Sequence, residues 1–177
     1  MEKVSNYHPV LVALHWLLAF MILGTLYFGS TVLAHVPNDD PHKLGMLQAH
    51  MSAGAAIFVM MLVRILTRRW TRHPPKATAK NAWLDRIAFV SHRLLYVAVM
   101  GQVMSGIGLA FEADLPAIVF GRQGVLPQDL WDFPLRYAHY GFSRLLMALI
   151  ALHVAGALWR RFVVKDDVMT RMVRPAR

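Results

Sequence analysis

The chain contains no cysteine among its 177 residues. It can therefore form neither a disulfide nor a zinc site with thiolate ligands. Iron–sulfur clusters and haem groups attached through thioether bonds are excluded for the same reason. Histidine and methionine remain as nitrogen and sulfur ligands, and the sequence has nine histidines and eleven methionines.

Charged residues are also scarce. They make up 16% of the chain, against about a quarter in an average soluble protein, whereas hydrophobic residues reach 56%. This balance is typical of an integral membrane protein. The net charge of +9 does not indicate a nucleic-acid partner, because the basic residues gather in blocks beside long apolar runs.

Four apolar runs dominate the sequence, and about 20 apolar residues suffice to cross about 30 Å of hydrocarbon. They cover roughly residues 9–34, 44–66, 87–111 and 137–162. Proline-containing segments separate them. We predict an all-α, four-helix transmembrane bundle that forms one domain over residues 1–177. The first run is too long for the hydrophobic part of a signal peptide, so we expect no cleaved leader.

Lysine and arginine predict the direction of the spans, because cytoplasmic loops carry more of them. Residues 64–86 hold seven, and the tail from Arg160 holds six. The other two connections hold only Lys43, Arg122 and Arg136. We therefore expect both termini and the middle loop to face the cytoplasm.

Five histidines fall inside the predicted spans, although this side chain is costly in a membrane. His139 and His153 lie on the fourth span, about 21 Å apart along a helix that rises 1.5 Å per residue. Fourteen residues are nearly four turns, so both rings point to the same face. Counting from the ends of the spans places His50 and His139 in an outer layer. His15, His92 and His153 form an inner layer.

Two layers of neutral imidazoles on facing helices match the needs of two haem groups, each of which takes two axial ligands. Spacing alone does not decide between His15 and His92 in the inner layer. The alternatives are interhelical hydrogen bonds and a proton or zinc relay. A carboxylate relay is disfavoured because no span contains Asp or Glu. His8, His35, His42 and His73 lie at edges or in loops, and we expect them at the surface.

Arginine within or beside a span needs an anionic or polar partner. Arg64 lies at the inner end of the second span, and Arg144 lies within the fourth. Since the spans offer no carboxylate, we expect both to pair with haem propionates, Arg64 on the inner side and Arg144 on the outer side.

Several short motifs are shared with a known family. They are LHW (Leu14–Trp16), AHMSAG (Ala49–Gly54), VRILTR (Val63–Arg68), SHRLLY (Ser91–Tyr96), the His139/His153 pair and KDDVMTRM (Lys165–Met172). Together, in this order, they resemble the bacterial cytochrome b561 family, whose members are four-helix, dihaem b-type cytochromes of the inner membrane. The resemblance covers nearly the whole chain.

The resemblance implies a ligand set. In the family the first, second and fourth spans supply the axial ligands. His15 and His153 would hold an inner haem b, and His50 with His139 an outer haem b. His92 would then be a surplus histidine near the inner haem, in contact with a quinone or a propionate.

The resemblance also implies an activity, which is electron transfer between an outer donor, the haem pair and ubiquinone or another membrane quinone. Some family members resemble superoxide oxidases, so superoxide is one expected donor. The outer loops carry more acids than bases, which does not favour an anionic substrate. The alternative is a haem-bearing anchor that passes electrons from a dehydrogenase or hydrogenase partner to quinone, although the short loops offer no large docking domain.

Overall fold

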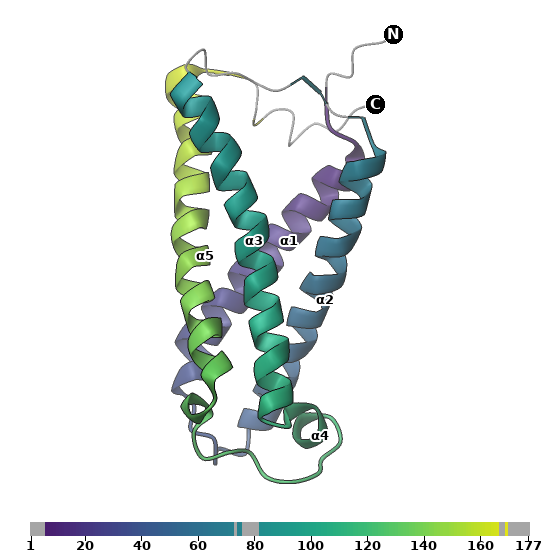
Figure 1. The fold of residues 1–177 in the computed structure, drawn as a ribbon, viewed down its shortest axis with the longest axis vertical. Helices are drawn as coiled ribbons and strands as arrows, with labels where there is room; N and C mark the ends of the chain where they lie inside the picture. Colours follow the sequence, from purple (N-terminus) through teal and green to yellow (C-terminus); the bar gives the residue numbers. More distant parts are fainter. Residues whose placement is uncertain (1–5, 73, 76–81, 167–168, 170–177) are drawn as a thin grey trace.

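The computed structural model describes residues 6–72, 74–75, 82–166 and 169. Figure 1 shows a bundle of four long helices that run alternately up and down. They are α1 (Pro9–Tyr27), α2 (Lys43–Trp70), α3 (Ala82–Glu112) and α5 (Pro134–Trp159). The all-α class and the four spans predicted from composition are confirmed, because each of these helices is long and apolar enough to cross a membrane.

Two of the helices extend beyond their α-helical parts. α1 continues into a π-helical turn, η1 (Phe28–Val32), and a 3₁₀ turn, η2 (Leu33–His35). α5 continues into a second π-helical turn, η4 (Arg160–Val164). The candidate spans are consequently Pro9–His35, Lys43–Trp70, Ala82–Glu112 and Pro134–Val164. Each encloses the corresponding run expected from the sequence and is slightly longer.

Local sequence explains where several helices begin. Pro9 and Pro134 occupy first positions of α1 and α5, where a missing N–H costs nothing. The connection between α3 and α5 contains a short helix, α4 (Leu115–Val119), and a 3₁₀ turn, η3 (Leu130–Asp132). Both are too short to show a clear hydrophobic period.

The closest helix packing occurs within two pairs, α3 against α5 and α1 against α2 (Figure 1). The main core lies where the four helices meet in the middle of the bundle. It includes Leu18, Met61, Val99, Val103, Leu146 and Leu149. The outer surface is also apolar, with Phe20 77% and Phe111 73% exposed. An apolar surface around a small core is the expected arrangement for helices surrounded by lipid.

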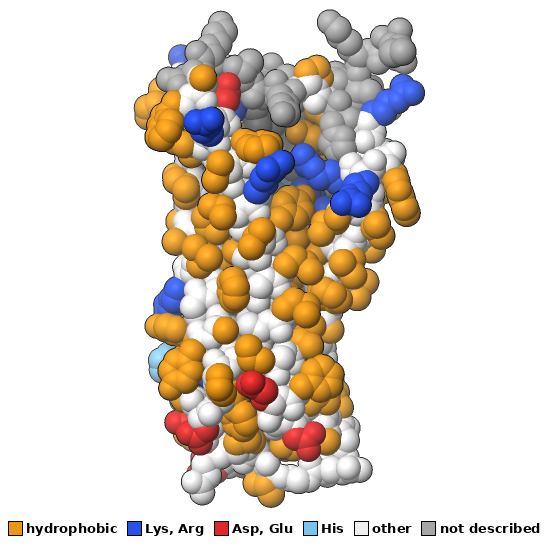
Figure 2. Space-filling model, viewed as in Figure 1, with side chains coloured by type: hydrophobic (Ala, Val, Ile, Leu, Met, Phe, Trp, Pro, Cys, Tyr) orange, Lys and Arg blue, Asp and Glu red, His pale blue; other side chains and the backbone are white. Residues whose placement is uncertain are grey.

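Charge divides the two ends of the molecule. In Figure 2, the basic side chains gather towards one end of the visible face and acidic side chains towards the other. The first residues of α1 and α3 and the last residues of α2 and α5 lie at the basic end (Figure 1). The orientation of the bundle in the membrane stays a prediction. His73, Lys76 and Lys80, part of the predicted middle loop, lie outside the described residues.

Lys43 has a different environment from the one expected of a loop cation. It is the first residue of α2 and only 5% exposed. Its Nζ donates to the carbonyl oxygens of Leu33 (2.8 Å) and Val36 (2.5 Å). The lysine therefore donates to carbonyl oxygens at the end of the first span, where helices leave carbonyls in need of a donor. Nearby, the backbone N–H of His42 donates to Asp40 and holds the pKa of that carboxyl below its usual value.

Candidate functional site

Two histidine pairs lie across facing helices. His15 on α1 faces His153 on α5, with ring centroids 6.3 Å apart. His50 on α2 faces His139 on α5, with centroids 6.2 Å apart. Two metal–imidazole bonds of about 2 Å each would separate the ligating nitrogens by about 4 Å, and the two rings account for the rest. Each pair therefore has room for one metal atom between its imidazoles.

The rings within each pair are close to perpendicular, at 73° and 83°. Among the described contacts, no hydrogen bond joins the two rings of either pair. The donors are neutral aromatic nitrogens in an apolar setting, which suits haem iron with two histidine ligands. The residues present thus fit two haem groups, one at each level of the bundle.

The outer-layer ring of His139 is held by α3. Its Nδ1 lies 3.0 Å from the backbone carbonyl oxygen of Gln102, so this nitrogen carries the proton and donates. The Ser105 hydroxyl donates to the same carbonyl and lies 3.3 Å from Nδ1. Nε2 is left with a lone pair, which accepts from the Gln102 amide at 3.0 Å. A histidine in this tautomer can bind a metal through Nε2.

Glycines let the neighbouring helices approach these rings closely. A Cβ on Gly106 of α3 would lie 2.9 Å from Cε1 of His139. A Cβ on Gly29 of η1 would lie 3.0 Å from Cε1 of His50. His50 Nδ1 is buried and has no hydrogen-bond partner among the described residues. Both rings of the outer pair are thus positioned by backbone that only glycine permits to come so near.

His92 lies beside the inner pair. Its ring centroid is 5.2 Å from that of His153, and the side chain is largely exposed. Its Nδ1 lies 2.5 Å from the carbonyl oxygen of Ala88, one turn earlier on α3. The structure therefore brings all three histidines of the expected inner layer together, with His15 and His92 on different helices around His153.

The two arginines expected at propionates have different surroundings. Arg64 is partly buried between helices, donating to the Leu11 carbonyl (2.7 Å) and the Tyr96 hydroxyl (3.1 Å). Its charge acts on His15, which places it near the inner pair. Arg144 is exposed, and its guanidinium lies 4.8 Å from the centre of the Tyr140 ring. No described contact joins Arg144 to the outer pair.

The sequence placed Arg136 in the connection before the fourth span and did not link it to a histidine pair. Arg136 lies in the first turn of α5, three residues before His139, with its guanidinium 4.4 Å from the Trp131 ring centre. Its charge acts on both His50 and His139. The sequence signal for this position was the spacing of three residues between Arg136 and His139, which places both side chains on the same face of one helix.

Gln102 and Ser105 were also missed as partners of His139. Both are polar residues within the apolar run of α3, and this position was the signal available in the sequence. The peripheral histidines fall where expected, since His8, His35 and His42 are exposed at helix ends or in loops, while His73 lies outside the described residues. In the part of the chain that the structure describes, no cluster of three or more His, Asp or Glu could hold a separate metal ion.

Comparison with known proteins shows the family of the chain. Residues 6–175 match the family model described as prokaryotic cytochrome b561. The chain is 25% identical to the "Probable superoxide oxidase CybB" of Yersinia pestis, over 96% of each chain. It is 22% identical to "Cytochrome b561 homolog 1" of Escherichia coli, over 96% of this chain and 98% of the relative. It is 27% identical to "Cytochrome b562" of Cereibacter sphaeroides, over 99% of each. The chain belongs to the prokaryotic cytochrome b561 family, which makes it a multi-pass membrane cytochrome.

Proposed function

We propose that the protein carries electrons across a bacterial inner membrane, between a donor at its acidic end and a membrane quinone at its basic end. This proposal rests on the two histidine pairs, which lie at two levels of one bundle. Their ring centroids are 6.3 and 6.2 Å apart. α5 supplies one member of each pair. A single helix thus sets the distance between the two sites.

In this proposal His15 and His153 hold one haem b, and His50 and His139 hold the other. A haem with two histidine ligands accepts and releases one electron at a time. The chain's own residues orient the ligands and keep water away. At the outer site, the Gln102 carbonyl holds the Nδ1 proton of His139 and presents Nε2 to the metal. The Gln102 amide, which donates to that Nε2, would give way when the metal binds.

Cationic groups near each site suit the haem propionates. Arg64 lies near His15 and is our proposed partner at the inner site. At the outer site, Arg136 acts on both histidines and also on Lys43. We propose Arg136 as the partner there, in place of the Arg144 expected from the sequence, whose described contact is with Tyr140.

The proposed donor is superoxide, the substrate in the printed name of one relative. Two superoxide ions would give two electrons and leave as oxygen, while one quinone takes up two electrons and two protons. Arg136 supplies positive charge beside the outer pair, which offsets the acidic loops for an approaching anion. His92, exposed beside His153, is the proposed contact for the quinone.

A reduced-minus-oxidised absorbance spectrum with haem quantification tests whether the protein binds haem as proposed. We expect two b-type haem groups per chain, and a preparation without haem would overturn it. Stopped-flow mixing of the quinone-loaded protein with superoxide then tests the donor. Rapid haem reduction followed by quinol formation is the expected result. Reduction only by a co-purified dehydrogenase or hydrogenase would instead establish the anchor function.

A further inference from the structure

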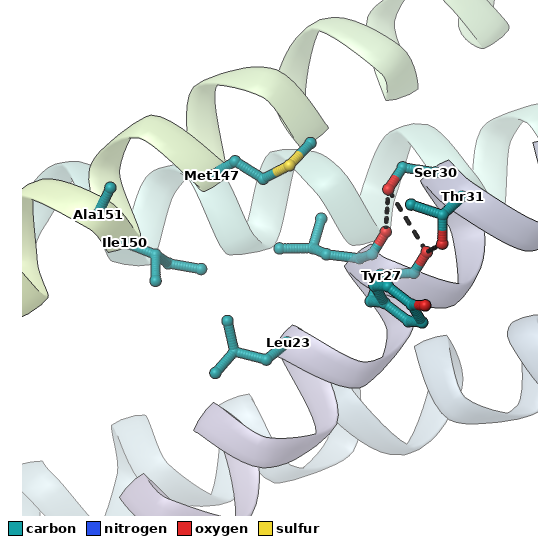
Figure 3. Close-up of a pocket in the computed structure, with 8 residues that line it drawn as sticks. Leu23, Tyr27, Ser30, Thr31, Met147, Ile150 and Ala151 are labelled. Carbon is teal, nitrogen blue, oxygen red and sulfur yellow. Dashed lines mark hydrogen bonds between the residues drawn. The ribbon is translucent and has the colours of Figure 1, made fainter.

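A shallow groove runs between the first and last spans, on the outer half of the bundle. Its volume is ≈ 380 Å³, within the range of about 300–1,000 Å³ found for small-molecule sites. Figure 3 shows side chains of the two helices lining it from opposite sides. They include Leu23, Tyr27 and Thr31 on the first span and Met147, Ile150 and Ala151 on α5.

The groove presents mainly apolar groups, although Tyr27, Ser30 and Thr31 in its lining carry hydroxyls. Ser30 Oγ donates to the Leu26 carbonyl at 2.6 Å, and Thr31 Oγ1 donates to the Tyr27 carbonyl at 2.6 Å (Figure 3). Both hydroxyls are therefore used within their own helix, as is common for Ser and Thr in spans. A hydrocarbon chain fits this lining better than a polar ligand does.

Arg144 lies on the same face of α5 as the groove. It precedes Met147 by three residues and Ala151 by seven, which places the three side chains along one stripe of the helix. At about 100° per residue, Arg144 lies about 140° around the helix axis from His139. It therefore points away from the face of α5 that carries the proposed haem ligands. Its guanidinium stacks on Tyr140 and is exposed. Arg144 is not itself part of the lining, but helical spacing places it about one turn beyond Met147, beside the end of the groove nearer the acidic end of the molecule.

The depth of Arg144 requires an anionic partner. Pro134–Val164 has 31 residues, so it is about 46 Å long and exceeds a hydrocarbon core of about 30 Å by about 8 Å at each end. Arg144 then lies about 7 Å below the membrane surface, from which an arginine reaches the headgroups by snorkelling. No acidic residue occurs in residues 9–34, 44–66, 87–111 or 137–162. A second copy of this chain therefore offers no carboxylate at that depth.

We propose that this groove binds a phospholipid of the outer leaflet, with its phosphate on Arg144 and one acyl chain between α1 and α5. The order of the groups matches such a lipid. The cation lies towards the membrane surface, and the apolar lining from Met147 to Leu23 leads towards the centre of the bilayer. Tyr140 holds the guanidinium against the helix, where it faces the headgroup rather than the histidine pairs.

Native mass spectrometry of the haem-loaded protein in detergent tests the proposal. The probe is dioleoylphosphatidylglycerol, and dioleoylglycerol is the matched lipid without phosphate. We expect one tightly retained phosphatidylglycerol and no retained dioleoylglycerol. Arg144→Gln should weaken retention at least about tenfold, as expected for loss of a charge-assisted hydrogen bond. Ala151→Trp, which fills the groove, should have a similar effect.

Arg93→Gln is the control, because Arg93 is also exposed within a span and stacks on an aromatic ring, Phe89, at 4.1 Å. It should retain the lipid as the unmodified protein does. Equal retention by Arg144→Gln would overturn the proposal. Loss of a bound quinone from Arg144→Gln, with the phospholipid retained, would also overturn it. Loss of the outer haem with the lipid retained would assign Arg144 to a propionate instead, and would leave the proposed electron transfer standing.

Discussion

His139 Nδ1 lies 3.0 Å from the backbone carbonyl oxygen of Gln102 on the neighbouring helix. This contact fixes both the tautomer and the orientation of one proposed haem ligand. It depends on the close approach of α3 to α5, and the sequence permits that approach with Gly106 opposite the ring. The outer site is thus built as much by the backbone of α3 as by the histidines themselves.

Gly106→Ala should therefore weaken the outer haem site without unfolding the bundle. The added Cβ would lie 2.9 Å from Cε1 of His139, so the ring must turn away from the Gln102 carbonyl. Loss of such a supporting contact typically costs 10–100-fold in metal affinity. Titration of the haem-free protein with haem, followed by absorbance, measures the change. Gly141→Ala on α5 is the control, since its Cβ meets nothing within 4 Å; equal effects of the two variants would contradict this account.

Removal of one ligand from each pair should remove one haem at a time. We expect His139→Ala to keep the inner haem and His153→Ala to keep the outer one, because each pair is a separate contact. Haem quantification should fall from two per chain to one in both variants, with different residual spectra. Loss of both haem groups from a variant that remains folded would show that the two sites are not independent.

His92→Ala should retain both haem groups and slow electron transfer to quinone. The ring of His92 lies beside His153 but is exposed, whereas His15 faces His153 from the opposite helix. We expect a raised KM for a soluble quinone analogue with unchanged haem content. His15→Ala is the matched variant and should lose the inner haem. If His92→Ala lost the haem and His15→Ala kept it, the assignment of ligands would be reversed.

Lys43→Met should lower the stability of the protein in detergent. The buried ammonium donates to the carbonyl oxygens of Leu33 and Val36, and its removal leaves both without this partner. Each buried group left unsatisfied costs about 1–3 kcal/mol in the free energy of unfolding. Thermal unfolding monitored by circular dichroism should show a lower Tm. Lys43→Arg keeps donors at this position and should recover part of the loss; a Tm unchanged in Lys43→Met would contradict the role.

Part of this architecture follows from local sequence. The four spans were predictable because length and hydropathy alone decide whether a helix can cross a bilayer. The two levels of histidines were predictable because a helix rises by a constant amount per residue. Helical periodicity also predicts which face of the fourth span carries Arg144. The propionates were its expected partners because the spans contain no carboxylate.

The tertiary structure decided what depends on the rotation and lateral order of the helices. Spacing along the chain placed His15 and His92 at one level, and the arrangement of α1 and α3 around α5 brings both of them to His153 from different helices. The same arrangement brings the Gln102 carbonyl to His139 and buries Lys43 against the end of the first span. These contacts join residues far apart in sequence, and no local pattern encodes them. The sequence by itself determined the spans and the depth of each histidine, and the packing of the helices determined their partners.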